Sequence, residues 1–313
     1  MDSNILVDWI TFSSKIDDVR SIIEFLGLTD WQGNFSPCNG RYYYRKAFRL
    51  GNINIYYDGI TADMGVCVEM SGQGCRDFES FGTGDWYSIF EYYMNNKEYV
   101  NVSRLDVAYD DFDRLLDLDN LITDTFAGNF VSKNKHWNVQ KGSRGATVEH
   151  GDRGGSMYIR IYDKKAERKR DDLEYWARCE LQMRDKLPCN FIEALLDGKE
   201  SIEMLYFKVL NNYLRYVEPS ETDSNKRRWK TAVHWDRFLQ TAEKRSIFVA
   251  PGVDYNMLGL HRYVIDTAGN AIKTYIEICG EDKFKEYLKS VKKSKNPKYE
   301  YLRNKAKLEG VSI

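Results

Sequence analysis

The sequence predicts an α+β fold, in which a mainly antiparallel sheet carries helices on one face and is followed by a helical C-terminal region. Short strand-like segments are separated by turn dipeptides such as Gly51-Asn52 and Asp58-Gly59, which indicates an antiparallel meander. From about Pro188 onwards, apolar residues recur at helical spacing instead. Strands with a few intervening helices are typical of one helical layer on a sheet.

The N-terminal part is predicted to open with a strand and a helix. Residues 5–12 alternate after a short apolar start, and residues 16–28 have helical spacing that ends near Gly27. Strands of the meander are then predicted at residues 42–50, 53–57 and 65–70. A helix over residues 78–95 is predicted to return the chain to the sheet.

Further along, the same patterns predict the rest of the sheet and then a change of structure. Strands are predicted at residues 102–110, 157–163 and 176–184, with a helix at 118–126. C-terminal helices are predicted at residues 191–196, 202–214, 229–243 and 259–278, with a polar loop or hinge at 219–228. We therefore predict two domains, residues 1–187 and residues 188–313.

Composition indicates a folded protein that binds an acidic polymer. The chain has 313 residues, of which 42% are hydrophobic and 14% aromatic, with only 5 Pro, which excludes a disordered chain. No run of about 20 apolar residues could span a bilayer and no leader is apparent, so we expect no membrane and a cytoplasmic location. The net charge is −1, yet residues 133–170 contain eleven Lys and Arg against four Asp and Glu.

Two predicted strands carry charged side chains on one face. By the period of two, Arg104, Asp106 and Asp110 share a face of one strand, and Arg178 and Glu180 share a face of another. If these strands are neighbours, Asp106 and Glu180 would form a hard oxygen site suited to Mg²⁺ or Mn²⁺. The alternative is that the same side chains form cross-strand ion pairs on a solvated face.

A third predicted strand combines tyrosines with positive charge. It points Tyr158, Arg160 and Tyr162 to one face, and Lys164 and Lys165 follow it. A free tyrosine has a pKa of about 10, so activating it as a nucleophile at pH 7 must recover roughly 4 kcal/mol, part of which neighbouring cations can supply. The alternatives are that these tyrosines only pack and that the cations are a solvated helix start. Cations beside aromatic rings favour nucleic acid as the ligand.

Other common sites are not supported. The four histidines form no closely spaced pair and no Cys-x-x-Cys occurs, so a zinc site is not expected. The glycine pairs match neither a phosphate-binding loop nor a dinucleotide-binding loop, so the use of ATP or NAD is not expected.

Taken in order, five segments resemble plasmid rolling-circle replication initiators of the Rep_trans type, and the likeness spans roughly residues 5 to 280. The segments are residues 7–12, 69–76, 104–110, 158–164 and 178–180. The resemblance implies a ferredoxin-like or RRM-like sheet related to the HUH endonucleases. This sequence lacks the histidine pair of those enzymes. Asp106 and Glu180, with Asp110 or Asp8, would have to hold the divalent Mg²⁺ or Mn²⁺ instead.

The resemblance also implies an activity. It implies an endonuclease that nicks and rejoins one strand at a double-strand origin through a 5′-phosphotyrosyl intermediate. The match to the family's Arg-x-Tyr-x-Lys pattern favours Tyr162 as the nucleophile, beside Arg160, with Tyr158 as the rival. The side chains assigned to DNA binding are Arg104, Tyr158, Lys164, Lys165 and Arg178.

The implied partners follow from the same resemblance. They are single-stranded, cruciform or supercoiled origin DNA, a second copy of the chain in a homodimer, and a host helicase. Residues 188–313 would serve DNA recognition or dimerisation, and residues 1–187 catalysis. Two alternatives stay open, namely a conjugative relaxase that nicks a transfer origin and a non-catalytic DNA-binding regulator.

Overall fold

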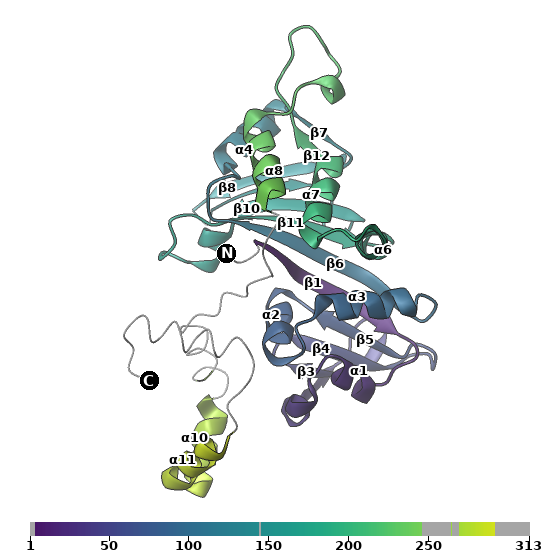
Figure 1. Cartoon of the computed structure of the whole chain (residues 1–313), viewed down its shortest axis with the longest axis vertical. Coiled ribbons are helices and arrows are strands. Elements are labelled where there is room, and N and C mark those ends of the chain that lie inside the picture. The colour runs from purple at the N-terminus through teal and green to yellow at the C-terminus, as the bar shows by residue number, and fades with distance from the viewer. Residues whose placement is uncertain (1–3, 144, 246–263, 265–268, 292–313) are drawn as a thin grey trace. The chain divides into compact units, whose positions relative to one another are not determined.

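Figure 1 shows the computed structural model, which describes residues 4–143, 145–245, 264 and 269–291. The chain divides into two units, Met1–Gly252 and Val253–Ile313. In the second unit the structure describes helices α10 (Gly269–Cys279) and α11 (Glu281–Ser290), which meet at Gly280 with a φ of +84°. The first unit contains the sheet and the candidate site.

The first unit is built on a sheet with ten strands among the described residues, and every neighbouring pair is antiparallel. The spatial order is β2-β3-β4-β5-β1-β6-β11-β10-β9-β8. The strands are β1 (Ile5–Ser14), β2 (Ser36–Asn39), β3 (Tyr44–Leu50), β4 (Ile53–Gly59), β5 (Val66–Met70), β6 (Val100–Asp111), β8 (Trp137–Gly142), β9 (Gly145–His150), β10 (Met157–Asp163) and β11 (Ala177–Arg184). A separate two-stranded sheet pairs β7 (Phe130–Ser132) with β12 (Leu214–Tyr216). The predicted α+β class is confirmed.

Helices follow or interrupt the strands along the chain. They are α1 (Val19–Phe25), α2 (Gly72–Phe81), α3 (Trp86–Asn95), α4 (Leu118–Ala127), α5 (Lys164–Arg168), α6 (Leu187–Gly198), α7 (Ile202–Tyr213) and α8 (Val233–Arg245), with short 3₁₀ turns η1 (Thr29–Asn34) and η2 (Lys226–Arg228). Several begin at a side chain that accepts from free backbone N–H groups of the first turn, as Asp85 does for α3 and Asp117 for α4. No described helix has the length and apolar character needed to cross a membrane.

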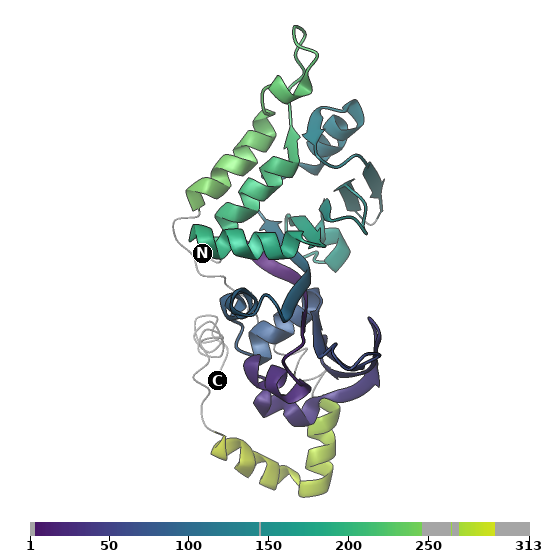
Figure 2. The ribbon, with the colours of Figure 1, turned by 90° about the vertical axis from the view of Figure 1, so that its right-hand side faces the viewer.

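The core lies between the sheet and the helices on one of its faces. Figure 2 shows α6, α7 and α8 together on one side of the sheet. Leu105, Val107 and Tyr109 of β6 are buried there, and the Tyr109 ring lies edge-on to Phe207 of α7 at 5.4 Å between centroids. The Tyr206 hydroxyl donates to the Cys179 carbonyl at 2.7 Å, which anchors α7 to β11. The opposite face, called here the open face, carries the alternate and mainly polar residues of the same strands.

Some predicted elements differ from the structure for identifiable reasons. The predicted helix 78–95 is two helices, because a Cβ on Gly82 would lie 2.4 Å from the Leu26 carbonyl oxygen and Gly84 has a φ of +67°. No strand is predicted at the places of β2, β7, β8, β9 and β12. The first holds Pro37 at the sheet edge, and β8 is mostly exposed, so neither has an apolar pattern.

The C-terminal helices occupy the predicted places as far as the structure describes them. Helix α6 begins with Pro188 in its first turn, a position that suits proline because no intrahelical N–H bond is lost. It packs on β6 and β11, and α7 packs on α8. The predicted helix 259–278 falls partly outside the described residues, and its second part is α10. The boundary between residues 187 and 188 stays a prediction.

Candidate active site

The register of four strands brings the predicted site residues onto the open face. Strand β11 lies between β6 and β10, so the predicted proximity of the strands with Asp106 and Glu180 is confirmed. Three rows of side chains cross these strands. The first row contains Asp106, Gln182 and Tyr158. The second contains Ala108, Glu180, Arg160 and Glu149, and the third contains Asp110, Arg178, Tyr162 and Thr147. Polar and aromatic side chains thus converge from four neighbouring strands.

Asp106 is a buried carboxyl with one cationic partner. Its side chain is 1% exposed, and Arg104 of the same strand binds it with Nε at 2.9 Å and Nη2 at 2.5 Å. Burial raises the pKa of Asp106 to about 8, which the Arg104 charge opposes and the nearby Glu180 and Asp8 charges reinforce. Glu180, also buried, accepts from Gln182 Nε2 at 2.9 Å.

The donors Asp106 and Glu180 fit a divalent cation in chemistry and in number. Mg²⁺ binds carboxylate oxygens and commonly takes only one or two from the protein, with water and substrate phosphate completing the shell. Burial is the main cause of the raised pKa of Asp106, and a bound cation would offset it by stabilising the ionised carboxylate. Within the described part of the chain, no three His, Cys, Asp or Glu side chains are already arranged around a common point for an ion. The fit is therefore to a two-carboxylate site.

This arrangement predicts a pH-dependent effect of Asp106→Asn. In metal-free protein the folded state keeps a proton on Asp106 up to about pH 8, whereas the unfolded chain releases it near pH 4. The wild type should therefore lose free energy of unfolding as the pH rises from about 4 to about 8, and the Asn variant should lose less. Thermal melts in EDTA across this range test it, and a constant difference between the two proteins would contradict it. Added Mg²⁺ at pH 8 should raise the Tm of the wild type only.

Arg178 binds two carboxylates at the end of these strands. Its guanidinium is buried and lies 2.9 Å from Asp8 and 2.7 Å from Asp110, whose other oxygen accepts from Nη2 at 2.7 Å. Trp176 Nε1 also donates to Asp110 at 2.8 Å. Burial opposes the charge, but Asp110 and Asp8 outweigh it and raise the pKa of Arg178 well above its usual value. Ion pairs therefore form here, but they differ from the predicted alternative of cross-strand pairs on a solvated face: Arg178 pairs across strands with Asp110 and is buried, and Arg104 pairs with Asp106 of its own strand. The roles of Arg178 as DNA contact and of Asp110 as metal ligand stay predictions.

Asp8 reaches this cluster through an irregularity of β1. The pairing of β1 with β6 shifts between Val7 and Trp9, which leaves Asp8 in a bulge. Helix α2 begins beside it, and a Cβ on Gly72 would lie 3.2 Å from Asp8 Oδ1. A Cβ on Gly74 would lie 2.3 Å from the Asn52 carbonyl oxygen, so this position requires glycine. The glycines of segment 69–76 therefore serve close packing.

Tyr162 lies under a layer of cations. Its side chain is buried, its hydroxyl accepts from Lys164 Nζ at 3.0 Å, and the Arg160 guanidinium lies 3.9 Å from the ring centroid. Burial raises the pKa of Tyr162 well above the usual value, while the Arg178 charge acts against this and Glu180 adds to it. Because Tyr162 is only 2% exposed, a phosphate can reach the hydroxyl only after the side chains that cover it move.

Lys164 is held in place by the start of a short helix. Asp163 accepts from the Ala166 N–H at 2.8 Å and begins α5, and Glu167 of that helix forms an ion pair with Lys164. Burial and the nearby Arg178 charge lower the pKa of Lys164, and Glu167 partly offsets this. Lys165 points elsewhere, with its Nζ 3.4 Å from the Glu174 carbonyl oxygen. Of the two predicted lysines, only Lys164 contacts the tyrosine.

Tyr158 has different surroundings. Its hydroxyl donates to Glu149, which also binds Arg153 at 3.0 Å. Burial and the bond to Glu149 raise the pKa of Tyr158 to about 12. It lies four residues from Tyr162 along one face, which is about 13 Å. Besides burial, the Glu180 and Asp8 charges add to the pKa of Tyr162, whereas Glu149 raises and Arg153 lowers that of Tyr158. By register, Tyr158 shares the row of Asp106, Tyr162 shares the row of Asp110 and Arg178, and Glu180 lies one row from each tyrosine.

Two residues of the site were missed by the analysis of the sequence. Trp9 lies under Arg104, with the guanidinium carbon 3.8 Å from a ring centroid, and Glu167 binds Lys164. The spacing of Glu167, three residues after Lys164, is a helical signal that could have shown it. Trp9 could not be placed, because the bulge at Asp8 shifts the alternation of β1.

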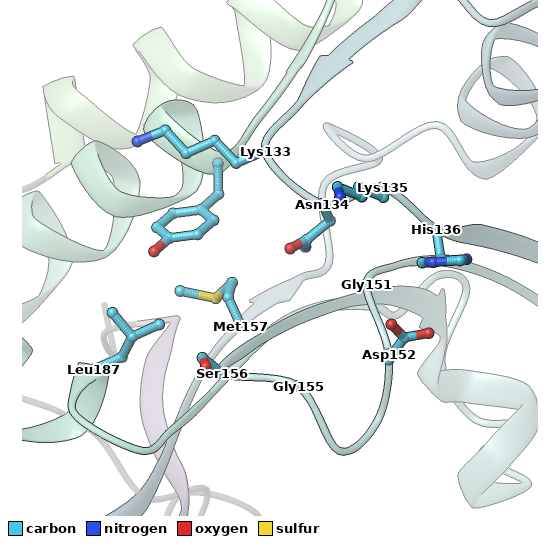
Figure 3. Close-up of a pocket in the computed structure, with 11 residues that line it drawn as sticks. Lys133, Asn134, Lys135, His136, Gly151, Asp152, Gly155, Ser156, Met157 and Leu187 are labelled. Atoms are coloured by element: carbon cyan, nitrogen blue, oxygen red, sulfur yellow. The ribbon is translucent and has the colours of Figure 1, made fainter.

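A pocket lies at the other end of β10 and is separate from these residues. It has a volume of about 320 Å³, and its lining includes Lys133, His136, Asp152, Ser156 and Met157 (Figure 3). Strand β10 begins at Met157 and ends beyond Tyr162, so the strand length separates the pocket from the tyrosine. We place the candidate active site on the open face, because the carboxylates, cations and tyrosine meet there.

Comparisons with known proteins agree with this architecture. Residues 100–291, more than half of the chain, match the family described as Replication initiation factor, and residues 4–92 match the Rolling Circle replication initiation protein N-terminal domain. The chain is 28% identical over 266 residues to a Bacillus subtilis (strain 168) protein named "Putative DNA relaxase NicK", covering 80% of this chain and 74% of that protein. It is similar to the solved rolling circle replication initiator protein from Geobacillus stearothermophilus, with a TM-score of 0.71 and 29% identity over 80% of this chain and 99% of that chain.

Proposed function

Because the chain belongs to the replication initiation factor family, we propose that it initiates rolling-circle replication by nicking and rejoining one DNA strand at an origin, with Tyr162 as the nucleophile. The family and its relatives support the initiation and nicking function. The observation that carries the choice of residue is the bond of 3.0 Å from Lys164 to the Tyr162 hydroxyl, beside the carboxylates of the open face.

The proposed reaction exchanges one phosphate ester for another. The Tyr162 oxygen forms a bond to the scissile phosphorus, and the bond from phosphorus to the 3′ oxygen breaks. The phenolic proton is balanced by the proton that the departing 3′ oxygen gains. The products are a 5′-phosphotyrosyl bond and a free 3′-OH that can prime a polymerase, and the strand can be rejoined later without ATP.

The surrounding cations match the charge changes of this reaction. Lys164 Nζ donates to the oxygen that becomes negative as the proton leaves, which stabilises the phenolate. Arg160, only loosely paired with Glu167 at 3.9 Å, is free enough to move from the ring to a phosphate oxygen. Arg178 would keep Asp8 and Asp110 neutralised beside the reacting phosphate.

Asp106 and Glu180 would hold the divalent ion, either Mg²⁺ or Mn²⁺. Such an ion supplies Lewis-acid stabilisation of phosphate charge when bound. Asp110 is the third predicted ligand, and it would first have to release one oxygen from Arg178. Arg104, which holds Asp106, would fix the orientation of that carboxylate rather than bind DNA directly.

The chemistry of the DNA ends tests this function. On a supercoiled plasmid that carries the origin, we expect the protein with Mg²⁺ to give an open circle whose 3′ end a polymerase extends. The 5′ end should stay covalently attached to the protein until protease digestion. Protein-free 5′ ends would contradict the phosphotyrosyl intermediate, and binding without any nick would favour the non-catalytic regulator.

A conjugative relaxase is the second candidate, because the Bacillus subtilis relative is named as a relaxase. Its chemistry would be the same, and only the DNA site would differ. Nicking at a transfer origin but not at a replication origin of the same element would favour it. A homodimer, a host helicase as partner and action in the cytoplasm are further proposals, which rest on the family resemblance.

A further inference from the structure

The turn between β2 and β3 has a conformation that its residues do not favour. Tyr42 and Tyr43 have φ values of +56° and +67°, and the Tyr44 N–H donates to the Arg41 carbonyl at 2.9 Å. Two consecutive positive φ values inside such a bond are typical of a type I′ turn, for which Asn-Gly is the favoured pair. Two tyrosines in these positions strain the backbone, and strained residues cluster at functional sites.

Buried contacts hold this turn against the open face. The Tyr42 hydroxyl donates to Glu69, which also accepts from Tyr56 at 3.0 Å, and the Tyr42 and Tyr56 rings meet edge-on at 5.5 Å. Glu69 is buried on β5, one strand from β1. The same turn leaves Tyr43 76% exposed, with no side-chain hydrogen bond or ring contact to another residue that the structure describes. The fold therefore fixes Tyr42 and presents the Tyr43 ring to solvent.

Positively charged residues neighbour Tyr43 in the sequence. Arg41 is exposed, and the Arg45 and Lys46 side chains are 56% and 62% exposed. Arg45 and Lys46 share the single carboxylate of Asp58 at 3.2 and 3.1 Å, so the cations outnumber their acidic partner. An exposed ring among cations is the combination that binds single-stranded nucleic acid by stacking on bases and neutralising phosphates.

The turn and the candidate active site share one continuous face. Glu69 faces Thr11 of β1, and Thr11 faces Arg104 of β6, which stacks on Trp9. Four strand spacings, about 19 Å, separate β5 from β10, which carries Tyr162. The row of Glu69, Thr11 and Arg104 also lies six residues, about 20 Å along the strands, from the row of Tyr162, so roughly 28 Å separates Glu69 from Tyr162. A single strand bound at Tyr162 can therefore cross Arg104 and Trp9 and reach the turn.

We propose that the turn at residues 41–44 is a single-stranded DNA contact, in which Tyr43 stacks on an unpaired base and Arg41, Arg45 and Lys46 contact phosphates. This inference rests on the proposed DNA-nicking function and adds a second point of attachment to it. The strand is held both at Tyr162 and at the turn.

Tyr43→Gly separates a binding role from a structural one. Glycine adopts the positive φ without strain and removes only an exposed ring, so the Tm should equal or exceed that of the wild type. The affinity for a fluorescein-labelled 30-nucleotide single strand of mixed sequence, measured by anisotropy without Mg²⁺, should fall roughly tenfold, since one stacked base contributes that order of affinity. The full chain is used throughout.

Two control variants test whether the loss of affinity is specific to the aromatic ring at position 43. Tyr43→Trp keeps a stacking ring and should retain the affinity, and Tyr99→Ala removes a tyrosine that is 49% exposed at the start of β6 and should leave it unchanged. An affinity of Tyr43→Gly within twofold of the wild type would overturn the inference and point to a protein partner for the turn. An equal loss in Tyr43→Trp, or a loss for duplex DNA alone, would also overturn it.

Failure of the inference is distinguishable from failure of the proposed function. If Tyr43→Gly binds like the wild type while the wild type forms its covalent DNA adduct, only the role of the turn is wrong. If the wild type neither binds a single strand nor forms an adduct, both are wrong. If the inference holds, Tyr43→Gly still forms the adduct when the oligonucleotide is in excess.

Discussion

Tyr162→Phe is expected to abolish formation of the covalent protein–DNA adduct, with a loss of nicking on the order of a thousandfold or more. The change removes the attacking oxygen and one hydrogen bond from Lys164, and it leaves the ring under Arg160 in place. DNA affinity and Tm should change little, because the phenyl ring fills the same space. Denaturing gels of labelled origin DNA, followed by mass spectrometry of the attached peptide, measure the adduct.

Tyr158→Phe is the matched control. It removes a hydroxyl from the same face of the same strand, one that is bonded to Glu149 instead of Lys164. The variant should still form the adduct, with at most a moderate loss of Tm, because Arg153 still binds the same Glu149 oxygen. An adduct peptide that contains Tyr158 would move the nucleophile to that residue and keep the reaction class. Full activity of Tyr162→Phe would contradict the proposed mechanism.

Arg178→Met is expected to have the largest effect on stability, a loss of about 3–5 kcal/mol in the free energy of unfolding. The guanidinium is the cation that binds both Asp8 and Asp110, and all three side chains are largely buried. Removing the guanidinium leaves the carboxylates of Asp8 and Asp110 without a cationic partner in a site from which water is mostly excluded. Urea unfolding followed by circular dichroism gives the difference in free energy.

Two further variants test whether the loss of stability in Arg178→Met comes from its buried ion pairs. Arg228→Met breaks the ion pair with Asp223, in which the Arg228 side chain is 67% exposed, and should leave the urea midpoint nearly unchanged. The double variant Arg178→Met with Asp110→Asn should be less destabilised than the sum of the two single variants, because the second change removes a carboxylate left unpaired by the first. Additive losses would show that Arg178 and Asp110 are not coupled.

Much of the sheet could be predicted because its central strands alternate cleanly. In β6, Leu105 and Val107 face the core while Arg104 and Asp106 face outward, so period two is evident in the sequence. Strand β8 could not be predicted, because an exposed edge strand has no buried face to impose a pattern. The break between α2 and α3 depends on the approach of Gly82 to Leu26, a contact between residues far apart in the chain.

The candidate site was predictable in its members but not in its pairings. Period two assigned Asp106, Glu180 and Tyr162 each to the polar face of its own strand, and this needs no knowledge of neighbours. Which carboxylate each arginine binds depends on register, and register is set by long-range contacts such as the pairing of Arg178 with Asp110. The burial of Tyr162 under Arg160 is likewise a product of three-dimensional packing.

The irregular pairing of β1 with β6 constrains how this protein can evolve. Strand β1 belongs to the region that matches the N-terminal domain family, and β6 belongs to the region that matches the replication initiation factor family. Asp8 of the N-terminal region completes the ion pairs of Arg178, which lies in the other region. Neither region can be exchanged for a relative's by recombination unless the incoming edge reproduces the bulge. Chimeras that combine the two regions from different relatives should therefore fold only if both relatives keep the bulge at Asp8. The two regions are thus expected to be inherited together.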